Sequence, residues 1–294
     1  MKTWGPSWKE LKLPYQPRNR THPFIPCCEQ ESPFLNSTRM NDLTTMKSKG
    51  KRDEGKNCIL IFIKYPERGM VKARLSECMD DNMVVSLYRS FVLDFLDTIR
   101  KGKHAFKIFF YPPESKEKVS KWLGRDFSCI PQKGKNLGER MKNAFCRTFS
   151  EGFSRVLLVG SDIPDLTNEV INVAFDLNDN DAVIGPAFDG GYYLIGFKSS
   201  AFLPEIFEGI PWSTDIVFER TMKIFRKYNY NIQVLPEWRD VDRLDDLKAL
   251  VRKNRETEFS NSRTMSFILN NMKELFSAPC IAYRRRRSRR RILQ

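Results

Sequence analysis

The chain of 294 residues has no long hydrophobic run and few residues of the kinds that build metal-binding or disulfide-rich domains. No apolar run reaches the roughly 18 residues expected of a membrane-spanning helix, and the first thirty residues lack the apolar core of a signal peptide. The two histidines and seven scattered cysteines do not show the spacing of a zinc site or a disulfide framework. We therefore expect a reducing, cytoplasmic environment.

Both common glycine-rich phosphate motifs are also missing. The sequence contains neither G-x-x-x-x-G-K-[ST] nor G-x-G-x-x-G, which argues against ATPase-type and dinucleotide-binding proteins. The composition, with 41% hydrophobic and 29% charged residues, is that of a globular protein. Its length allows one large domain or two small ones.

The net charge of +14 is concentrated at the two ends of the chain. Residues 1–57 carry a net charge of +5 and residues 281–294 carry +7, whereas residues 58–280 carry only +2. A basic nucleic-acid-binding face on the folded part is therefore not indicated. The Arg-rich tail leaves open a weak, salt-sensitive contact with nucleic acid or an anionic surface.

Three segments follow from these patterns. Residues 1–57 are rich in proline and polar residues and predict a disordered N-terminal extension, although translation could instead start at Met40 or Met46. Residues 58–252 alternate apolar runs with amphipathic helices and predict a single domain. Residues 253–294 form a C-terminal segment that ends in the Arg-rich tail.

The alternation within 58–252 predicts an α/β fold with a mostly parallel sheet. The expected strands are 58–63, 106–111, 155–160, 181–187, 192–197 and 231–236, with a short apolar stretch near 127–130. The expected helices are 84–99, 114–123, 137–150, 168–177, 214–228 and 244–251. The turn between 181–187 and 192–197 is short enough for these two strands to pair as a hairpin.

Ligands of open α/β sheets bind beyond the carboxyl ends of the strands, so the residues that follow strands are the first candidates for a site. After the first strand, Lys64, Arg68, Lys72 and Arg74 surround Gly69, and together they could grip an anion such as a diphosphate. The alternative is a solvated basic loop without a ligand.

Carboxylates follow two further strands. Asp162 follows 155–160, where it could hold Mg²⁺ or Mn²⁺, because these ions prefer a few carboxylates together with phosphate oxygens. A helix N-cap at Asp165 or Thr167 is an equally good interpretation of that segment. Asp240 and Asp242 follow the last strand, and alternate residues of an extended segment point the same way, toward one ion or one acceptor.

The turn Asp189-Gly190-Gly191 places a carboxylate beside two residues without side chains, so a substrate could approach the backbone there. A plain hairpin turn needs the same residues. In the segment at 209–215, Trp212 could line a pocket or fill the core. Ser213, Thr214 and Asp215 could cap the following helix, whose positive end could face a phosphate.

Six blocks, taken in order, resemble one family. They are K-x-x-x-x-G-x-V-K-x-R-L at 64–75, LGERM at 137–141, GSDIPDLT at 160–167, GPAFDGGYYLIGF at 185–197, GIPWSTD at 209–215 and DVD at 240–242. They are similar to the DUF2064-type glycosyltransferases, also called radical-SAM/selenodomain-associated transferase 1. The resemblance covers about 58–252 and implies a GT-A-like three-layer α/β/α sandwich of the nucleotide-diphospho-sugar transferase superfamily.

The resemblance also implies roles for individual residues. Asp162 would bind a Mg²⁺ or Mn²⁺ that bridges the nucleotide phosphates, helped by Asp240 or Asp242, and Asp189 would act on the acceptor. The phosphate-binding set would include Lys72 and Arg74, and also Gly138 and Arg140 of LGERM. The pocket would include Gly190, Gly191, Tyr192, Trp212, Ser213 and Thr214.

These roles imply a metal-dependent glycosyltransferase that moves a sugar from a nucleoside diphospho-sugar to a small-molecule acceptor. The alternative is a guanylyltransferase-like nucleotidyltransferase that joins an NTP to a phosphorylated small molecule and releases pyrophosphate. The departures from the family pattern are Ala73, Ser161, Ile163 and Arg243, and none removes a charged group from a matching block.

Overall fold

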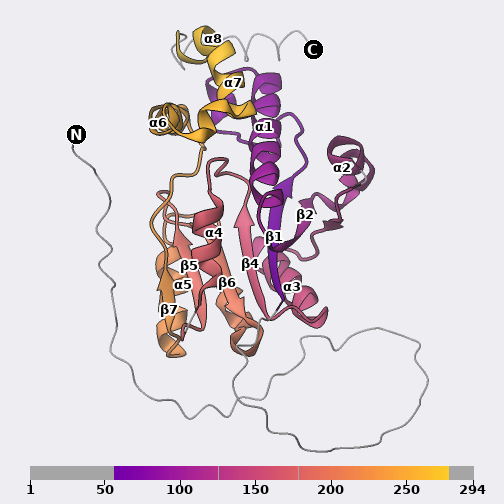
Figure 1. Ribbon diagram of the computed structural model, residues 1–294, viewed down its shortest axis with the longest axis vertical. Helices are drawn as coiled ribbons and strands as arrows, with labels where there is room; N and C mark the ends of the chain where they lie inside the picture. The colour runs from indigo at the N-terminus through magenta and orange to yellow at the C-terminus, as the bar shows by residue number, and fades with distance from the viewer. Residues whose placement is uncertain (1–55, 125, 178, 278–294) are drawn as a thin grey trace, which may run out of the picture.

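The computed structural model describes residues 56–124, 126–177 and 179–277 (Figure 1). The Arg-rich tail, Met40, Met46 and all but the end of the predicted 1–57 extension lie outside these residues, and so the predictions made for them are untested. The three segment boundaries likewise stay predictions.

A seven-stranded sheet with the order β3-β2-β1-β4-β6-β5-β7 forms the centre of the described region. Neighbouring strands run parallel except where β6 pairs antiparallel with β4 and β5. The predicted mostly parallel sheet and the predicted hairpin are therefore confirmed. The strands are β1 (Asn57–Lys64), β2 (Ala105–Tyr111), β3 (Cys129–Pro131), β4 (Arg155–Gly160), β5 (Ala182–Pro186), β6 (Tyr192–Lys198) and β7 (Ile232–Val234).

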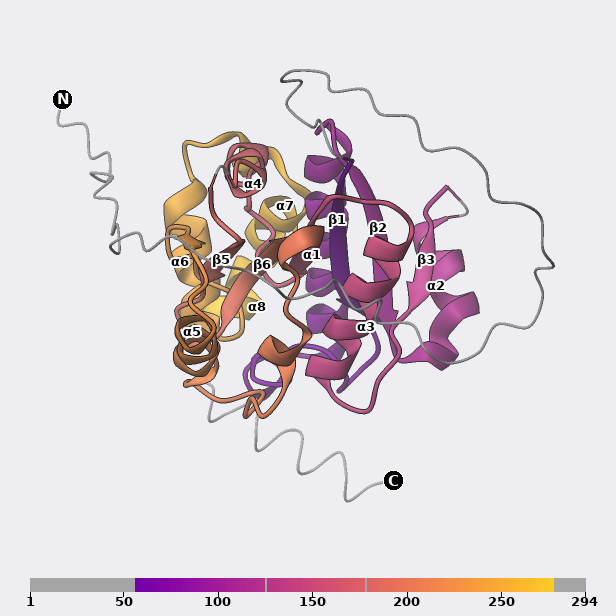
Figure 2. The same ribbon diagram turned by 90° about the horizontal axis from the view of Figure 1, so that it is seen from below.

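Helices cover both faces of the sheet and complete the predicted three-layer sandwich (Figure 2). One face is covered by α1 (Asp81–Arg100), α2 (Lys116–Leu123), α4 (Asn168–Phe175), α6 (Leu244–Asn254), α7 (Arg263–Asn270) and α8 (Met272–Ser277). The other face is covered by α3 (Leu137–Ser150) and α5 (Val217–Lys227). The remaining short helical turns are 3₁₀-helical.

Strand β1 shows why this sequence forms a central strand. Ile59, Ile61 and Ile63 pack into the core on the side of α1, whereas Leu60 and Phe62 pack into the core on the side of α3. Both faces are buried, so the strand is a continuous apolar run rather than an alternating one. Burying each large side chain contributes about 1.5–3 kcal/mol, and this anchors the carboxyl end of β1 where the site forms.

Helix α5 begins at Val217, three residues later than predicted. Ser213 has a φ of 68°, in the left-handed region, so this residue belongs to the loop that precedes α5. The predicted capping by Ser213, Thr214 or Asp215 is wrong, since Ile216 is the N-cap residue. The Thr214 hydroxyl instead donates to the Pro211 carbonyl oxygen at 2.7 Å and closes the preceding loop.

The C-terminal helices α7 and α8 extend the core beyond the predicted 58–252 domain. Met265 and Ile268 of α7 are buried with the side chains of α1. The buried carboxylate of Asp94 on α1 accepts hydrogen bonds from the backbone N–H groups of Arg263 at 3.1 Å and Thr264 at 2.7 Å. These N–H groups have no partner within a helix, so a side chain of α1 satisfies the first turn of α7.

The cysteines are only partly as expected. Cys58 and Cys129 are free thiols. Cys78 is disulfide-bonded, which departs from the expectation of a fully reduced chain. Within the described part of the chain, no helix combines the length and apolar character needed to cross a membrane.

Candidate active site

A cleft of 840 Å³ lies beyond the carboxyl ends of β1, β2, β4 and β5. This is where a parallel α/β sheet is expected to bind ligands. Most of the predicted site residues line it: Lys64, Lys72, Arg74, Arg140, Asp162, Asp189, Gly191, Tyr192, Trp212, Ser213, Thr214, Asp240 and Asp242. The fold therefore brings together residues from six blocks of sequence.

Three predicted glycines do not line the cleft. A Cβ on Gly138 would lie 2.8 Å from Trp212 Nε1 and would also meet the Phe207 carbonyl oxygen, so the missing side chain makes room for protein rather than ligand. Gly190 has a φ of +85°, and its Cβ position would meet the backbone of Asp215. Gly69 lies in the open loop after β1 without a close neighbour at its Cβ position.

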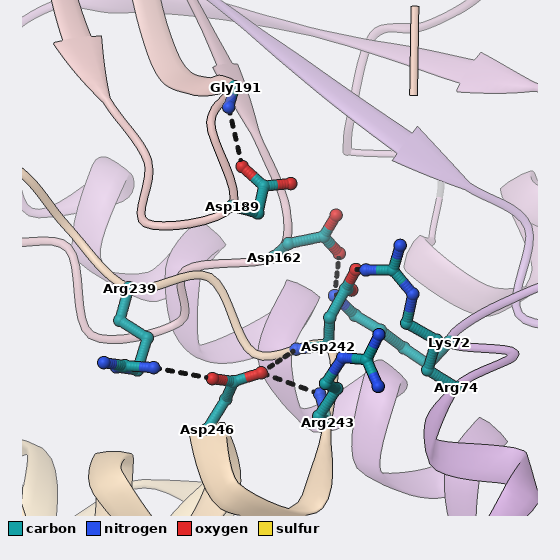
Figure 3. Close-up of polar contacts among 9 residues, drawn as sticks. All are labelled: Lys72, Arg74, Asp162, Asp189, Gly191, Arg239, Asp242, Arg243 and Asp246. Atoms are coloured by element: carbon teal, nitrogen blue, oxygen red, sulfur yellow. Dashed lines mark hydrogen bonds and ion pairs between the residues drawn. The ribbon is translucent and has the colours of Figure 1, made fainter. Parts of the chain in front are cut away.

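Lys72 is the most buried charged side chain at the cleft, and it is enclosed by acidic partners. Its ammonium lies 2.6 Å from Asp162 Oδ1 and 2.9 Å from Asp242 Oδ1, and its side chain is only 3% exposed (Figure 3). Burial lowers the pKa of Lys72, but the two carboxylates outweigh burial and raise the pKa above its ordinary value. Lys72 is therefore a buried cation held between the carboxylates of Asp162 and Asp242.

Asp242 has both of its carboxylate oxygens engaged. Oδ1 accepts from Lys72, and Oδ2 accepts from Arg74 at 3.2 Å. Burial raises the pKa of Asp242, but Lys72 and Arg74 together hold it below its usual value. The turn is held from α6, where Asp246 accepts from the backbone N–H groups of Asp242 at 3.3 Å and Arg243 at 2.8 Å (Figure 3).

Asp189 lies on the turn between β5 and β6, and its side chain is fixed by that turn. Its Oδ1 accepts from the Gly191 backbone N–H at 2.8 Å (Figure 3). Because this bond uses one oxygen, the other oxygen is left to meet a ligand in the cleft. The arrangement suits a carboxylate that orients a hydroxyl group or takes its proton.

Asp240 is the carboxyl group of the cleft whose ionisation is most hindered. Burial and the nearby charges of Asp189, Asp242 and Asp162 raise its pKa from 3.8 to about 7, although Lys72 opposes the shift. Burial and the carboxylates of Asp189, Asp242 and Asp162 therefore disfavour a negative charge on Asp240. A cation near Asp162, Asp189 and Asp240 would relieve this repulsion.

Asp240 predicts a pH dependence of stability. Its pKa is higher in the folded state than in the unfolded chain, so the folded state binds more protons at this position between about pH 4 and 7. The free energy of unfolding is then expected to fall as the pH rises from 5 to 8, and Asp240→Asn should remove this part of the slope. Urea unfolding in EDTA at several pH values measures it. Asp245→Asn, at the exposed start of α6, is the control, and an Asp240→Asn slope equal to the control's would contradict the prediction.

Several residues that line the cleft were not predicted. Tyr111 ends β2 and Gln132 follows β3, so the strand-end rule that identified Asp162 would have identified them too. Tyr88 lies in the predicted helix 84–99 and was not singled out as a site residue. Its hydroxyl lies 2.7 Å from Ser161 Oγ and accepts from the Lys64 backbone N–H at 3.0 Å, which ties the ends of β1 and β4 together.

Asp165 is not part of the site. Its buried carboxylate accepts from Trp238 Nε1 at 2.9 Å and from Asn254 Nδ2 at 3.0 Å, and it lies 2.8 Å from Lys253 Nζ. It therefore ties the segment after β4 to α6. The N-cap residue of α4 is Thr167, as one of the two interpretations predicted.

Residues 95–214 match the sequence model of a family described as "Uncharacterized protein conserved in bacteria (DUF2064)". A crystal structure of a candidate nucleotide-diphospho-sugar transferase from Desulfovibrio desulfuricans G20 is 41% identical with a TM-score of 0.73, covering 75% of this chain and 97% of that one. Rv0371c from Mycobacterium tuberculosis H37Rv, in complex with manganese, is 14% identical with a TM-score of 0.43, covering 67% and 98%. No curated protein matches this chain.

The three-layer sandwich with its strand-end cleft is the fold of the nucleotide-diphospho-sugar transferases, and it defines an enzyme of the transferase class. The chain belongs to the DUF2064 family. The resemblance carried by the six sequence blocks, and the fold that it implied, are both confirmed.

Proposed function

We propose that the protein is a metal-dependent glycosyltransferase that moves a sugar from a nucleoside diphospho-sugar to a small-molecule acceptor. The observation that carries the proposal is the mixed charge of one cleft. Asp162, Asp189 and Asp240 come from the ends of different strands and face a space that also contains cationic side chains. A nucleotide diphosphate needs such cations, and an acceptor hydroxyl needs such a carboxylate.

The acidic residues fit a divalent ion that the substrate helps to bind. The described residues contain no group of three or more His, Cys, Asp or Glu side chains arranged to hold a metal by themselves. Mg²⁺ and Mn²⁺ commonly use one or two carboxylates with phosphate oxygens, and Asp162 and Asp240 would supply them. The side chain of Asp162 is 50% exposed, so it can accept from Lys72 and still meet a ligand.

The metal, when bound, would neutralise charge that develops on the leaving nucleoside diphosphate. Asp242 would remain the counter-ion of Lys72 and Arg74, because both of its oxygens are engaged. Asp189 would orient the acceptor hydroxyl or take its proton as the acceptor oxygen bonds to the sugar. Tyr192 and Trp212, whose rings meet edge to face at 6.4 Å, would form the apolar wall of the pocket.

The test is nucleotide binding by Asp162→Asn. A nucleoside diphospho-sugar at about 100 times its dissociation constant should stabilise the wild-type protein by about 2.7 kcal/mol when Mn²⁺ is present. We expect Asp162→Asn to weaken this binding by at least about tenfold. A thermal-shift panel of diphospho-sugars and nucleoside triphosphates, with and without Mn²⁺, measures both effects. The control is Asp176→Asn, an exposed position at the end of α4.

The outcomes separate the two reaction types. Metal-dependent stabilisation by a diphospho-sugar, lost in Asp162→Asn, would support glycosyl transfer and identify the donor. A response confined to triphosphates would favour nucleotidyl transfer, in which an acceptor phosphate attacks the α-phosphorus and pyrophosphate leaves. Unchanged affinity in Asp162→Asn would contradict the metal role of this residue.

A further inference from the structure

The cations that line the cleft fall into two groups. Lys72 and Arg74 are ion-paired with Asp162 and Asp242. Lys64 and Arg140 also line the cleft, but neither makes an ion pair with an acidic side chain in the part of the chain that the structure describes. A cation without an acidic partner keeps its full attraction for an anionic ligand.

Arg140 is held in the cleft by an aromatic ring. It lies in the first turn of α3, and its guanidinium carbon is 4.2 Å from the centre of the Tyr111 ring. Its Nε atom is buried, and no described residue accepts a hydrogen bond from it. Stacking on a ring fixes the plane of the guanidinium and leaves its edge to donate to an oxyanion. A buried N–H group without an acceptor lowers the stability of the protein, and a bound oxyanion would supply that acceptor.

Lys64 ends β1 beside Tyr111, its register partner at the end of β2. Its backbone N–H is fixed by the Tyr88 hydroxyl at 3.0 Å, while its side chain is exposed at the cleft. Lys64 and Arg140 therefore both lie next to Tyr111, on the β1–β2 side of the cleft.

The start of α3 adds to the same positive region. This helix has 14 residues, and Leu137, Arg140 and Met141 of its first turns line the cleft. A helix N-terminus carries a partial positive charge, which here points toward the space beside Arg140. Glu139 does not cancel it, because its carboxylate accepts from the Lys135 backbone N–H at 2.8 Å and from Asn136 Nδ2 at 3.3 Å, away from the cleft lining.

We infer that Lys64 and Arg140, on the Tyr111 platform, form the diphosphate-binding subsite of the cleft. Of the side chains expected from sequence to hold the diphosphate, Lys72 and Arg74 are the counter-ions of Asp162 and Asp242, which leaves Lys64 and Arg140 for the ligand. The inference rests on the proposed function, since it assumes a nucleotide substrate, but it narrows the anion contacts to one part of the predicted set. The nucleotide then lies on the β1–β2 side, and the acceptor lies toward Asp189.

Inorganic pyrophosphate is the probe, titrated by calorimetry into the full-length protein in EDTA. The wild-type protein should bind it without metal, and Arg140→Gln should weaken binding by at least about tenfold. Lys64→Gln should weaken it as well, and Arg140→Lys should give an intermediate loss because a lysine keeps the charge but not the planar fork. The control is Arg147→Gln, farther along α3, where the arginine pairs with Glu151 and is 51% exposed.

Two results would overturn the inference: Arg140→Gln binding pyrophosphate as tightly as the Arg147→Gln control, or a wild-type protein that binds no pyrophosphate in EDTA at millimolar concentration. Circular dichroism of Arg140→Gln shows whether the variant is folded, and Lys64→Gln provides an independent result if it is not. The experiment uses neither metal nor sugar nucleotide. The protein could therefore bind pyrophosphate through Arg140 and yet bind none of the nucleotides tested. That result would refute the proposed function but would still support an anion-binding subsite at Lys64 and Arg140.

Discussion

Lys72→Met is expected to lower the free energy of unfolding by about 2 kcal/mol and to abolish tight nucleotide binding. The substitution leaves Asp162 and Asp242 facing each other without the ammonium that lies between them. Breaking a fully buried ion pair costs about 3–5 kcal/mol. The cost here should be smaller, because Asp162 is 50% exposed and Asp242 keeps Arg74 as a partner.

The backbone of Lys72 adds to this expectation. Its φ is 47°, in the left-handed region that costs a residue with a side chain about 1–2 kcal/mol. The two ion pairs offset this strain in the wild-type protein, and methionine would keep the strain without them. The loop at 64–75 should then loosen and release Asp162 from its position beside the cleft.

Urea unfolding and nucleotide titration measure the two effects. The control is Lys248→Met, which removes a surface lysine whose partner Asp245 is 89% exposed and which should change stability by less than about 0.5 kcal/mol. Lys72→Met/Asp242→Asn should recover part of the lost stability, because one of the unpaired carboxylates is removed. A Lys72→Met protein as stable as the control would show that the ion pairs do not hold this loop.

The sequence predicted the elements and the edge of the sheet that carries the site. Apolar runs such as RVLLVG at 155–160 identify buried strands, and residues after strands must gather at one edge when the strands are parallel. That rule was enough to bring Asp162, Asp189 and Asp240 to one cleft. This prediction did not depend on the conformations of the loops.

The partners of the charged side chains could not be predicted in the same way. Lys72 and Asp242 are 170 residues apart, and nothing in the spacing of either segment shows that one would enclose the other. The basic loop therefore looked like a set of free cations. Only the three-dimensional arrangement shows that Lys72 and Arg74 are paired, while Lys64 and Arg140 have no acidic partner among the described residues.

Two glycines of the site blocks, Gly138 and Gly190, make room for other segments of the protein. A glycine in a loop block suggests close approach by a ligand, but the space beside Gly190 is filled by the backbone of Asp215. The Phe218 backbone N–H also donates to the Gly190 carbonyl oxygen at 2.9 Å, which joins the β5–β6 turn to α5. Close approach between two segments of protein leaves the same sequence signal as close approach to a substrate.

Gly138→Ala tests this interpretation, because helix propensity and packing predict opposite signs. Alanine is favoured over glycine within a helix by about 1 kcal/mol. In this protein the added Cβ would lie 2.8 Å from Trp212 Nε1 and against the Phe207 carbonyl oxygen. We therefore expect Gly138→Ala to lower the free energy of unfolding by about 1–3 kcal/mol, the usual cost of overpacking.

The same substitution should weaken nucleotide binding, since the displaced Trp212 forms one wall of the cleft. Urea unfolding of Gly138→Ala, Trp212→Ala and the double variant forms a thermodynamic cycle. If the indole causes the overpacking, the double variant should lose less stability than the two single losses added together. Additive losses would place the clash on the Phe207 carbonyl oxygen alone, and a stabilised Gly138→Ala would mean that the loop at 207–214 moves aside freely and does not fix the cleft wall.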